Sequence, residues 1–475
     1  EKIVFSSELR ALKEVLPLKV NKGIVSDYLY LGYNFQNITP YENVKELNGG
    51  TYIQLDLTTN EQREVKWFDI FESYNKTTDY SKSEALELLD DYLHLAVRRR
   101  IESSDLDVGA FLSGGIDSGL ITAIASEYHK NIKTFTVRMP GAYDESRLAE
   151  LVAKKYQTQH HTIDISFDNL KNDFVKIVSN YGEPFFDSSA IPSYYVSKAA
   201  KEHITVVLNG DGADELFGGY RRYVPFQYLN FFDTNSSLKR AVGLLSKVLP
   251  VAHEKKSKYN FIYRLAQLAS YKDALKVYNA STTDLLVGFE NQFIKLPGLK
   301  DVKEMLEKVN SLPITPLNKA LLADYNALLF SDLLPKMDIA TMAHSLEGRS
   351  PFLSKEILEF APGLPDQLKV KGTTTKVLLR ALAHKYLPYE LTHQPKRGFE
   401  IPLKNWVEND LKSIVEDSIY TSNPFYADYI KPSFVKDLYE KRLTVSDEKR
   451  AKILYSILCL EIWNSSQRVT NLVNR

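Results

Sequence analysis

The pattern of apolar and polar residues predicts a strand-rich beginning, a middle of alternating strands and helices, and a helical remainder. Within residues 1–68, the apolar run Thr51 to Leu57, the turn Thr58 to Asn60 and a second short run are typical of a hairpin. Ile3 to Phe5 indicates another strand. These runs predict the edge of a β-rich domain, and the polar stretch within residues 69–82 predicts a linker.

The next segment is predicted to be a helix that begins at Ser81, because Ser81 and Glu84 have the spacing of a capping box. Strands and helices then alternate. Strands are predicted over 108–112, 132–139, 160–165 and 204–208, and helices over 119–128, 145–156, 168–180 and 190–202. Such alternation predicts an α/β fold with a parallel sheet and helices on both faces.

The rest of the chain has a helical pattern. Lys319 to Leu334 places its apolar residues along one stripe, which we interpret as core packing. The α/β core is therefore expected over about residues 104–230, and the helical remainder over about residues 231–475.

Composition narrows the classes of function. The 475 residues include 60 Lys and Arg and 60 Asp and Glu, so no global charge attracts nucleic acid or an anionic membrane. The one cysteine, Cys459, excludes an intramolecular disulfide, and its apolar surroundings in the sequence predict a buried side chain. No segment approaches about 20 apolar residues and no signal peptide is visible. We expect a cytoplasmic protein without nucleic-acid or membrane partners.

A turn of small residues follows the first strand of the α/β region and leads into a helix. Gly114 and Gly115 let the backbone bend sharply and approach an anion without a Cβ in the way. The backbone N–H groups and the helix N-terminus favour a phosphate or pyrophosphate, to which Ser113 and Ser118 add hydroxyl donors. Asp117 can hold Mg²⁺ against phosphate oxygens. A tight turn without a ligand is the alternative. No P-loop lysine follows, so transfer of a γ-phosphate is not predicted.

A second loop, Asn209 to Tyr220, follows another predicted strand. Asp211, Asp214 and Glu215 crowd the start of a helix there, and such carboxylates repel one another unless a cation or the helix dipole compensates. Asp214 would complete a Mg²⁺ site with Asp117 in one interpretation. In the other, the carboxylates only cap the helix.

Two further segments could supply cations to a departing pyrophosphate. Arg349 stands before a helix that begins at a proline, and Lys376 opens a later helix. Lys396 and Arg397 follow in a loop. Taken alone, each of these residues could equally be a solvated surface charge.

Other chemistries find no motif in the sequence, which lacks HExxH, GxSxG and EF-hand patterns. His160 and His161 are adjacent in a predicted strand, so their rings are expected on opposite faces rather than in one metal site.

These residues together resemble the glutamine-dependent asparagine synthetase family over nearly the whole chain. The resemblance is carried by Phe5 to Glu8, Leu112 to Ser118, Tyr143 to Glu145, Glu183 with Pro184, Gly210 to Tyr220, Ser345 to Phe352, and Lys376. The Ser-Gly-Gly-x-Asp-Ser signature is shared with NAD and GMP synthetases and tRNA-thiolating enzymes, whereas the Gly210 to Tyr220 block is narrower. The resemblance implies an ATP-pyrophosphatase fold, similar to the adenine nucleotide alpha hydrolases, over residues 83–475. Residues 1–68 would be the C-terminal part of an N-terminal-nucleophile glutaminase domain.

The resemblance also implies roles for site residues. The loop from Ser113 through Gly114, Gly115 and Asp117 to Ser118 would hold the β- and γ-phosphates of ATP. Leu112, Val137 and Gly210 would form the nucleoside pocket, with Asn209 beside them. Asp117 and Asp214 would hold Mg²⁺, Arg349 and Lys376 would neutralise the departing pyrophosphate, and Asp211 would act as a base or orienting group. The implied reaction converts aspartate and ATP to β-aspartyl-AMP, from which ammonia displaces AMP.

Two departures from the family pattern stand out. Asn209 occupies a position where the family commonly has Ser, and its amide can still form hydrogen bonds. The N-terminal cysteine of the family's glutaminase domain has no counterpart, and the chain opens on Glu1. We therefore expect either a longer native N-terminus or the use of free ammonia.

Three functional hypotheses follow. The first is asparagine synthesis, with aspartate and ammonia or glutamine as small-molecule substrates. The second is a paralogous amidotransferase that acts on another carboxylate, such as a surface-polysaccharide uronic acid or a peptide side chain. The third is a silent scaffold, which would have no chemical need for Asp117, Asp211, Asp214, Arg349 and Lys376 together. A tRNA-thiolating enzyme would need a catalytic cysteine or a basic face. A homodimer is compatible with all three hypotheses.

Overall fold

The computed structural model describes residues 3–76, 78–138, 144–165, 170–229, 242, 258–271, 274–282, 285–393 and 401–473. Three residues singled out in the sequence, Tyr143, Lys396 and Arg397, lie outside these described residues.

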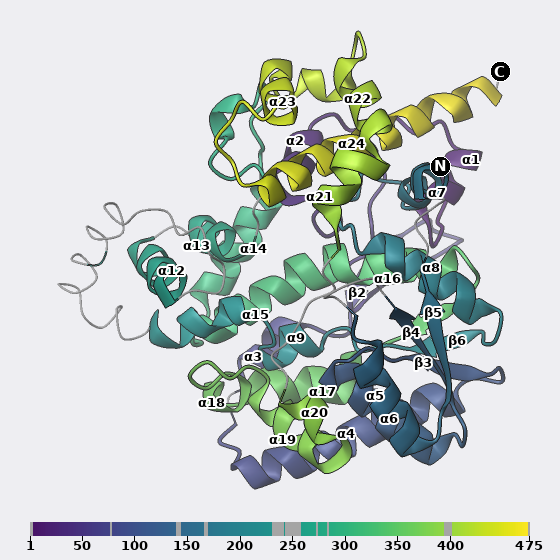
Figure 1. The fold of residues 1–475 in the computed structure, drawn as a ribbon, viewed down its shortest axis with the longest axis vertical. Coiled ribbons are helices and arrows are strands. Elements are labelled where there is room, and N and C mark those ends of the chain that lie inside the picture. The colour runs from purple at the N-terminus through teal and green to yellow at the C-terminus, as the bar shows by residue number, and fades with distance from the viewer. Residues whose placement is uncertain are drawn as a thin grey trace.

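A five-stranded parallel sheet forms the centre of the α/β region (Figure 1). Its strands are β3 (Val108–Phe111), β4 (Lys133–Arg138), β5 (Gln159–Asp164), β6 (Val206–Leu208) and β7 (Glu347–Arg349). Their spatial order is β5-β4-β3-β6-β7, and every neighbouring pair is parallel. The chain thus moves outward from β3 through β4 to β5 and then places β6 on the other side of β3. Ligands of such sheets bind beyond the carboxyl ends of the strands where this direction reverses.

Helices cover both faces of the sheet, as the sequence predicts. On one face lie α4 (Lys82–Glu102), α5 (Ile116–Tyr128), α6 (Ser146–Tyr156) and α19 (Val377–Tyr386). On the other face lie α7 (Leu170–Asn180), α8 (Ala190–Lys201) and α16 (Leu334–Met342). The predicted capping box of α4 is confirmed, because the Glu84 N–H donates to Ser81 Oγ and the Ser81 N–H donates to the Glu84 carboxylate.

The helical remainder contains one prediction that needs correction. Lys319 to Leu334 is predicted as a single helix, but α15 (Pro316–Asp324) passes into a π-helical stretch at Tyr325–Leu333 before α16 begins. The extra residue per turn in a π-helix rotates the side chains that follow, and such stretches are frequent at functional sites. The next helices along the chain are α17 (Lys355–Phe360) and α18 (Asp366–Lys369).

The other helices lie mostly toward the C-terminus, and none of those described is long and apolar enough to cross a membrane. They are α12 (Lys258–Ser270), α13 (Ala274–Thr282), α14 (Lys300–Ser311), α20 (Tyr389–Thr392), α21 (Leu403–Asn405), α22 (Lys412–Tyr420), α23 (Pro432–Tyr439) and α24 (Asp447–Val473).

Residues 1–68 contain fewer strands than the sequence predicts. The predicted hairpin is present as β1 (Thr51–Leu55) and β2 (Gln62–Lys66), which pair antiparallel. The preceding segment forms two helices, α1 (Leu9–Val15) and α2 (Val25–Leu31), and Ile3 to Phe5 lies outside any strand. Part of the expected linker is the short helix α3 (Ile70–Tyr74). That residues 1–68 derive from a glutaminase domain stays a prediction.

The N-terminal segment packs into the same apolar core as the rest of the chain. The Tyr28 hydroxyl on α2 donates to the Ser456 carbonyl on α24 at 3.0 Å, and the Tyr41 hydroxyl donates to the Gly182 carbonyl at 2.9 Å. The predicted burial of Cys459 on α24 is confirmed.

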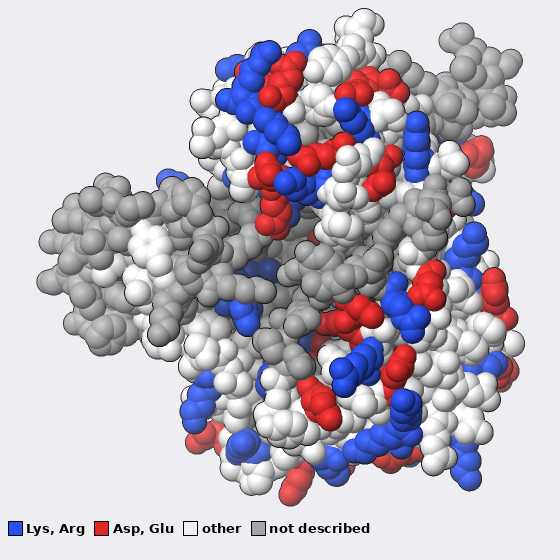
Figure 2. All heavy atoms as spheres, viewed as in Figure 1, with Lys and Arg blue, Asp and Glu red and all other residues white. Residues whose placement is uncertain are grey.

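Charged groups are spread over the surface. On the face in Figure 2, Lys and Arg side chains are interspersed with Asp and Glu, as expected for a chain of zero net charge. Some charged side chains are buried instead. Lys369 on α18 is fully buried, and its ammonium donates to Asn318 Oδ1 at 2.7 Å and to the Pro362 carbonyl at 2.9 Å. Burial lowers the pKa of Lys369 to about 7.

The buried Lys369 makes the stability of the protein depend on pH. Its pKa in the folded state lies below the value of 10.5 that it has when exposed, so the unfolded chain binds the extra proton between these values. The free energy of unfolding should therefore rise with pH between about pH 7.5 and about pH 9, by at most about 1.4 kcal/mol per pH unit from this group. Urea unfolding at several pH values measures it.

The matched comparison for this prediction is Lys369→Met against Lys371→Met, because Lys371 is an exposed lysine two residues away. The pH dependence should be lost in Lys369→Met and kept in Lys371→Met. Equal slopes in the two variants would contradict the assignment of the pH dependence to Lys369.

Candidate active site

The loop between β3 and α5 is held in shape by its own serines. The hydroxyl oxygens of Ser113 and Ser118 lie 2.8 Å apart, and the Ser113 N–H donates to Ser118 Oγ at 3.0 Å. The Gly115 N–H donates to Ser113 Oγ at 3.2 Å. A Cβ on Gly114 would lie only 2.8 Å from the Cβ of Glu145, so a side chain does not fit there. The loop is therefore a tight turn at the N-terminus of α5, where backbone N–H groups favour an anion.

The loop between β6 and α9 (Ala213–Phe217) lies against the first loop. A Cβ on Gly210 would lie 3.1 Å from the Cβ of Asp117, so the two loops are in near contact. The Asn209 side-chain oxygen accepts from the Asp211 N–H at 3.3 Å. Gly212 has a φ of +88°, which glycine adopts at little cost, and its turn starts α9 beside α5.

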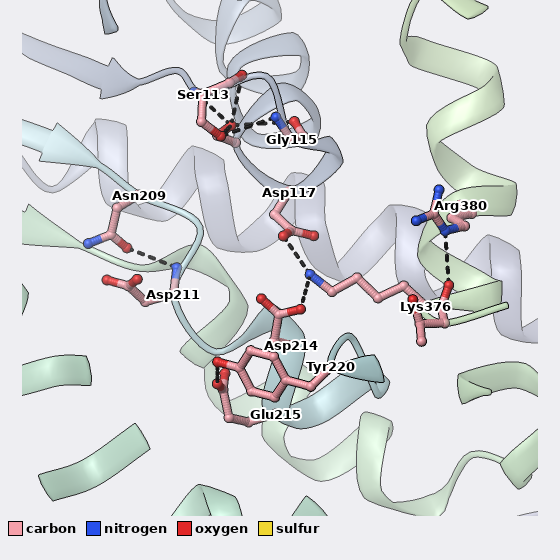
Figure 3. Close-up of polar contacts among 12 residues, drawn as sticks. Ser113, Gly115, Asp117, Asn209, Asp211, Asp214, Glu215, Tyr220, Lys376 and Arg380 are labelled. Carbon is pink, nitrogen blue, oxygen red and sulfur yellow. Dashed lines mark hydrogen bonds and ion pairs between the residues drawn. The ribbon is translucent and has the colours of Figure 1, made fainter. Parts of the chain in front are cut away.

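Lys376 joins the two loops electrostatically (Figure 3). Its Nζ lies 2.5 Å from Asp117 Oδ2 and 2.7 Å from Asp214 Oδ1. A Cβ on Gly219 would lie 1.6 Å from Asp214 Oδ1, so the pair needs a glycine beside it. Burial disfavours the ammonium, but Asp117 and Asp214 outweigh this and raise the pKa of Lys376. Lys376 is therefore a buried cation that compensates both carboxylates.

The two carboxylates also suit a magnesium ion that is shared with a nucleotide. Asp117 Oδ1 is buried and has no hydrogen-bond partner among the described residues, so one oxygen is left for a further cation. Magnesium is usually held by one or two carboxylates together with substrate phosphates. No group of three or more His, Cys, Asp and Glu side chains placed to hold a metal occurs in the described part of the chain.

A cavity of about 950 Å³ opens at this point, beyond the carboxyl ends of β3 and β6. It collects twelve of the thirteen residues predicted as site residues, although their roles stay predictions. They are Leu112, Ser113, Gly114, Gly115, Asp117, Ser118, Val137, Asn209, Gly210, Asp211, Asp214 and Lys376. The parallel sheet made it possible to expect that four separate segments of the chain would meet here. The distances between these segments could not be obtained from the sequence.

Arg349 is the predicted residue that does not line this cavity. Its guanidinium donates to the Arg100 carbonyl at 2.7 Å and to Ser103 Oγ at 3.1 Å, so it caps the C-terminus of α4, and it also pairs with Glu347. The sequence predicts only a following helix here, whereas residues Glu347–Arg349 form β7, the edge strand next to β6. Strand pairing fixes the direction of the Arg349 side chain, and in this structure that direction leads away from the phosphate loop.

Arg380 lines the cavity instead, and sequence reasoning missed it. It lies four residues after Lys376, one turn along α19, and this spacing is a signal that could have identified it. Its guanidinium donates to the Thr375 and Thr392 carbonyls, which fix its position. Burial lowers the pKa of Arg380, while the charge of Asp117 opposes this effect.

Lys336 on α16 also lines the cavity and was not predicted. Its Nζ lies 3.0 Å from Asp187 Oδ2, an ion pair that joins α16 to the loop before α8. No motif marks either residue, because they are far apart in the sequence and meet only in the folded chain.

Asp211 lines the cavity and lies within electrostatic reach of Lys336, Asp214 and Asp117. Burial raises the pKa of Asp211 to about 6; Lys336 acts in the opposite direction, and Asp214 and Asp117 raise the pKa further. One of its oxygens, Oδ2, is buried without a hydrogen-bond partner among the described residues. A carboxylate in this state can accept a proton near neutral pH.

Comparisons with known proteins point to one family. A family model described as asparagine synthase matches residues 88–465. The chain is 30% identical over 468 residues to the glutamine-hydrolyzing asparagine synthetase 1 of Bacillus subtilis (strain 168), which covers 98% of this chain and 72% of the relative. It is 28% identical over 474 residues to an asparagine synthetase homologue of Mycobacterium tuberculosis (strain ATCC 25618 / H37Rv), covering 97% of this chain and 70% of the relative.

The geometry predicts that magnesium can replace the charge of Lys376. In Lys376→Met the carboxylates of Asp117 and Asp214 lose their cation, and removing one partner of a buried ion pair typically costs about 3 kcal/mol. The melting temperature of the variant should fall, and MgCl₂ should raise it by more than it raises that of the wild type. Thermal unfolding with and without MgCl₂ measures both effects.

The control for this prediction is the double variant Asp117→Asn with Lys376→Met, which removes one carboxylate and should lose the larger response to magnesium. A response of equal size in the single and double variants would show that magnesium acts elsewhere.

Proposed function

The chain belongs to the asparagine synthase family, a family of ligases, and we propose that it converts L-aspartate, ATP and ammonia to L-asparagine, AMP and pyrophosphate. The observation that carries this proposal is the contact of Lys376 with Asp117 and Asp214 beside the turn at Ser113 to Ser118. Hydrogen-bond donors that can hold an anion, one cation and two carboxylates therefore surround one cavity.

The first half of the proposed reaction activates the carboxylate. A side-chain oxygen of aspartate attacks the α-phosphorus of ATP, the bond to the bridging oxygen breaks, and pyrophosphate leaves. In this proposal the N–H groups and hydroxyls at Ser113 to Ser118 hold the β- and γ-phosphates, and Lys376 and Arg380 stabilise the charge of the leaving pyrophosphate. Magnesium bound at Asp117 and Asp214 would add positive charge at the phosphates. Leu112, Val137 and Gly210 would line the nucleoside pocket.

The second half forms the amide. Ammonia attacks the acyl carbon of β-aspartyl-AMP, the carbon–oxygen bond to AMP breaks, and the nitrogen loses a proton. Asp211 is the group that we assign to this proton, because its carboxylate has a free oxygen and a pKa near 6. The pH of the solution must therefore lie above this pKa for Asp211 to be deprotonated and act as a base.

The nitrogen source and assembly belong to the proposal as well. The Bacillus subtilis relative is named for glutamine hydrolysis, and glutamine would supply ammonia to this chain through a glutaminase domain. Free ammonium serves as the nitrogen source in the tests below. A homodimer stays a prediction.

Release of pyrophosphate tests the proposed reaction directly. With ATP, magnesium and ammonium present, L-aspartate should stimulate pyrophosphate release, and L-asparagine should form in equal amount, whereas galacturonate and aspartyl or glutamyl peptides should not stimulate release. Coupled pyrophosphate detection and amino-acid chromatography measure the two products. Stimulation by a uronic acid or a peptide without stimulation by L-aspartate would contradict asparagine synthesis. It would show that the enzyme amidates another carboxylate.

Two arginines provide a matched test of the pyrophosphate contacts. Arg380→Gln should lower the rate of L-aspartate-dependent pyrophosphate release about 100-fold, because a donor to the leaving group is lost in a partly buried site. Arg349→Gln should leave that rate within about threefold of wild type and instead lower the melting temperature, because it removes a cap from α4. Steady-state kinetics and thermal unfolding measure both. If only Arg349→Gln lowered the rate strongly, Arg349 and not Arg380 would be the residue that contacts the pyrophosphate.

A further inference from the structure

A buried ion pair lies in the wall of the cavity on the opposite face of the sheet from α5 and α19. Lys336 Nζ contacts Asp187 Oδ2 at 3.0 Å, and the side chains are only 13% and 21% exposed. A lysine in such a position has to be paired, and Asp187 satisfies that need. The same ammonium group also lines the cavity, where it can meet a negatively charged ligand.

The position of Lys336 is fixed from several directions. The Ser189 N–H and hydroxyl both donate to Asp187 Oδ1, at 2.9 and 2.8 Å, so the carboxylate cannot rotate freely. The Tyr181 hydroxyl donates to the Lys336 carbonyl at 3.1 Å. The π-helical stretch Tyr325–Leu333 ends three residues before Lys336 and sets the direction from which α16 enters the cavity wall.

The charges around Lys336 keep it protonated. Burial disfavours the ammonium, but Asp187, Asp332 and Asp211 outweigh burial and raise its pKa. Among the described residues, Asp187 is the one hydrogen-bond acceptor of its Nζ, so two of its three N–H donors are left for a ligand. Such donors in a low-dielectric wall match a carboxylate or phosphate oxygen.

The phosphates of a nucleotide have other cations. Lys376 and Arg380 come from α19, on the face that carries α5 and its phosphate-binding turn. Lys336 comes instead from α16, on the face that carries α8, and it lines the same cavity as Asp211. In Figure 3 Asp211 lies away from the Lys376 side chain, on the other side of Asp117 and Asp214. Lys336 therefore reaches the cavity from a different element than Lys376 and Arg380 do.

An acceptor that is adenylated here must place one carboxylate at the α-phosphate. A dicarboxylic acceptor has a second carboxylate a few bonds away, which stays unreacted and needs a cation. We propose that Lys336, oriented by Asp187, binds the non-reacting carboxylate of a dicarboxylic amino-acid acceptor and so selects it over a monocarboxylate. This inference rests on the proposed function, since it names how the same site would recognise its acceptor.

Wild-type kinetics give the first test. β-Alanine has the geometry of L-aspartate without the α-carboxylate, so its KM in ATP-dependent pyrophosphate release should exceed that of L-aspartate at least tenfold. Equal KM values for the two acceptors would overturn the proposal without the need for any variant. No pyrophosphate release with L-aspartate or β-alanine would instead remove the proposed function.

The variant Lys336→Met gives the second test. The KM for L-aspartate should rise at least tenfold, while the KM for ATP and the KM for β-alanine stay within twofold of wild type. Lys336→Gln, which keeps a donor for Asp187 but removes the charge, should give the same result and serves where Lys336→Met does not fold. Lys198→Met, the same change at an exposed lysine on α8, should behave as wild type.

A merely structural role for Lys336 would give a different pattern. It would raise the KM values for ATP, β-alanine and L-aspartate together, or lower kcat while the KM for L-aspartate stays unchanged. Either pattern overturns the proposal and leaves the proposed reaction intact.

Discussion

The site depends on one electrostatic constraint, which is that Asp117 and Asp214 cannot lie side by side in a partly buried cavity without a cation between them. Lys376 meets this need through contacts of 2.5 and 2.7 Å. The three residues come from the start of α5, from α9 and from the N-terminus of α19, so the contact fixes segments about 260 residues apart in the chain. A nucleotide with its metal ion would fit the same arrangement of charges. The metal ion would face the two carboxylates, and the negative phosphates would face Lys376.

The parallel sheet makes this arrangement possible. The order β5-β4-β3-β6-β7 places β3 and β6 side by side, so the loops that follow them meet at one edge, and Gly210 comes close to Asp117. Helices on opposite faces then bring different cations to one cavity. Lys376 and Arg380 come from α19 and Lys336 comes from α16. Asp211 lines the same cavity; burial, Asp214 and Asp117 raise its pKa to about 6, and Lys336 acts against them.

Local signals in the sequence predicted four strands of the sheet, the helices beside them and the two loops that meet at the cavity, because turns, caps and strands depend on neighbouring residues. The capping box at Ser81 and the glycines of the phosphate loop are of this kind. The strand β7 has three residues, too few for a periodic pattern, so neither this strand nor its pairing with β6 was predicted. Lys336 and Asp187 could not be paired from sequence, because 149 positions separate them and only the fold brings them together. Arg380 is an intermediate case, since its helical spacing from Lys376 was available.

The described part of the N-terminal segment lines none of the cavity, but it forms hydrogen bonds with the chain close to Asp187. The Gly182 carbonyl accepts from the Tyr41 hydroxyl and from the Trp463 indole N–H, and Asn34 donates to the Glu183 carboxylate at 2.8 Å. Burial raises the pKa of Glu183 to about 8, and the hydrogen bond from Asn34 acts against this shift. These contacts hold the chain a few residues before Asp187, the partner of Lys336. The packing of residues 1–68 against α24 is therefore linked by hydrogen bonds to Gly182 and Glu183, in the segment that leads to Asp187.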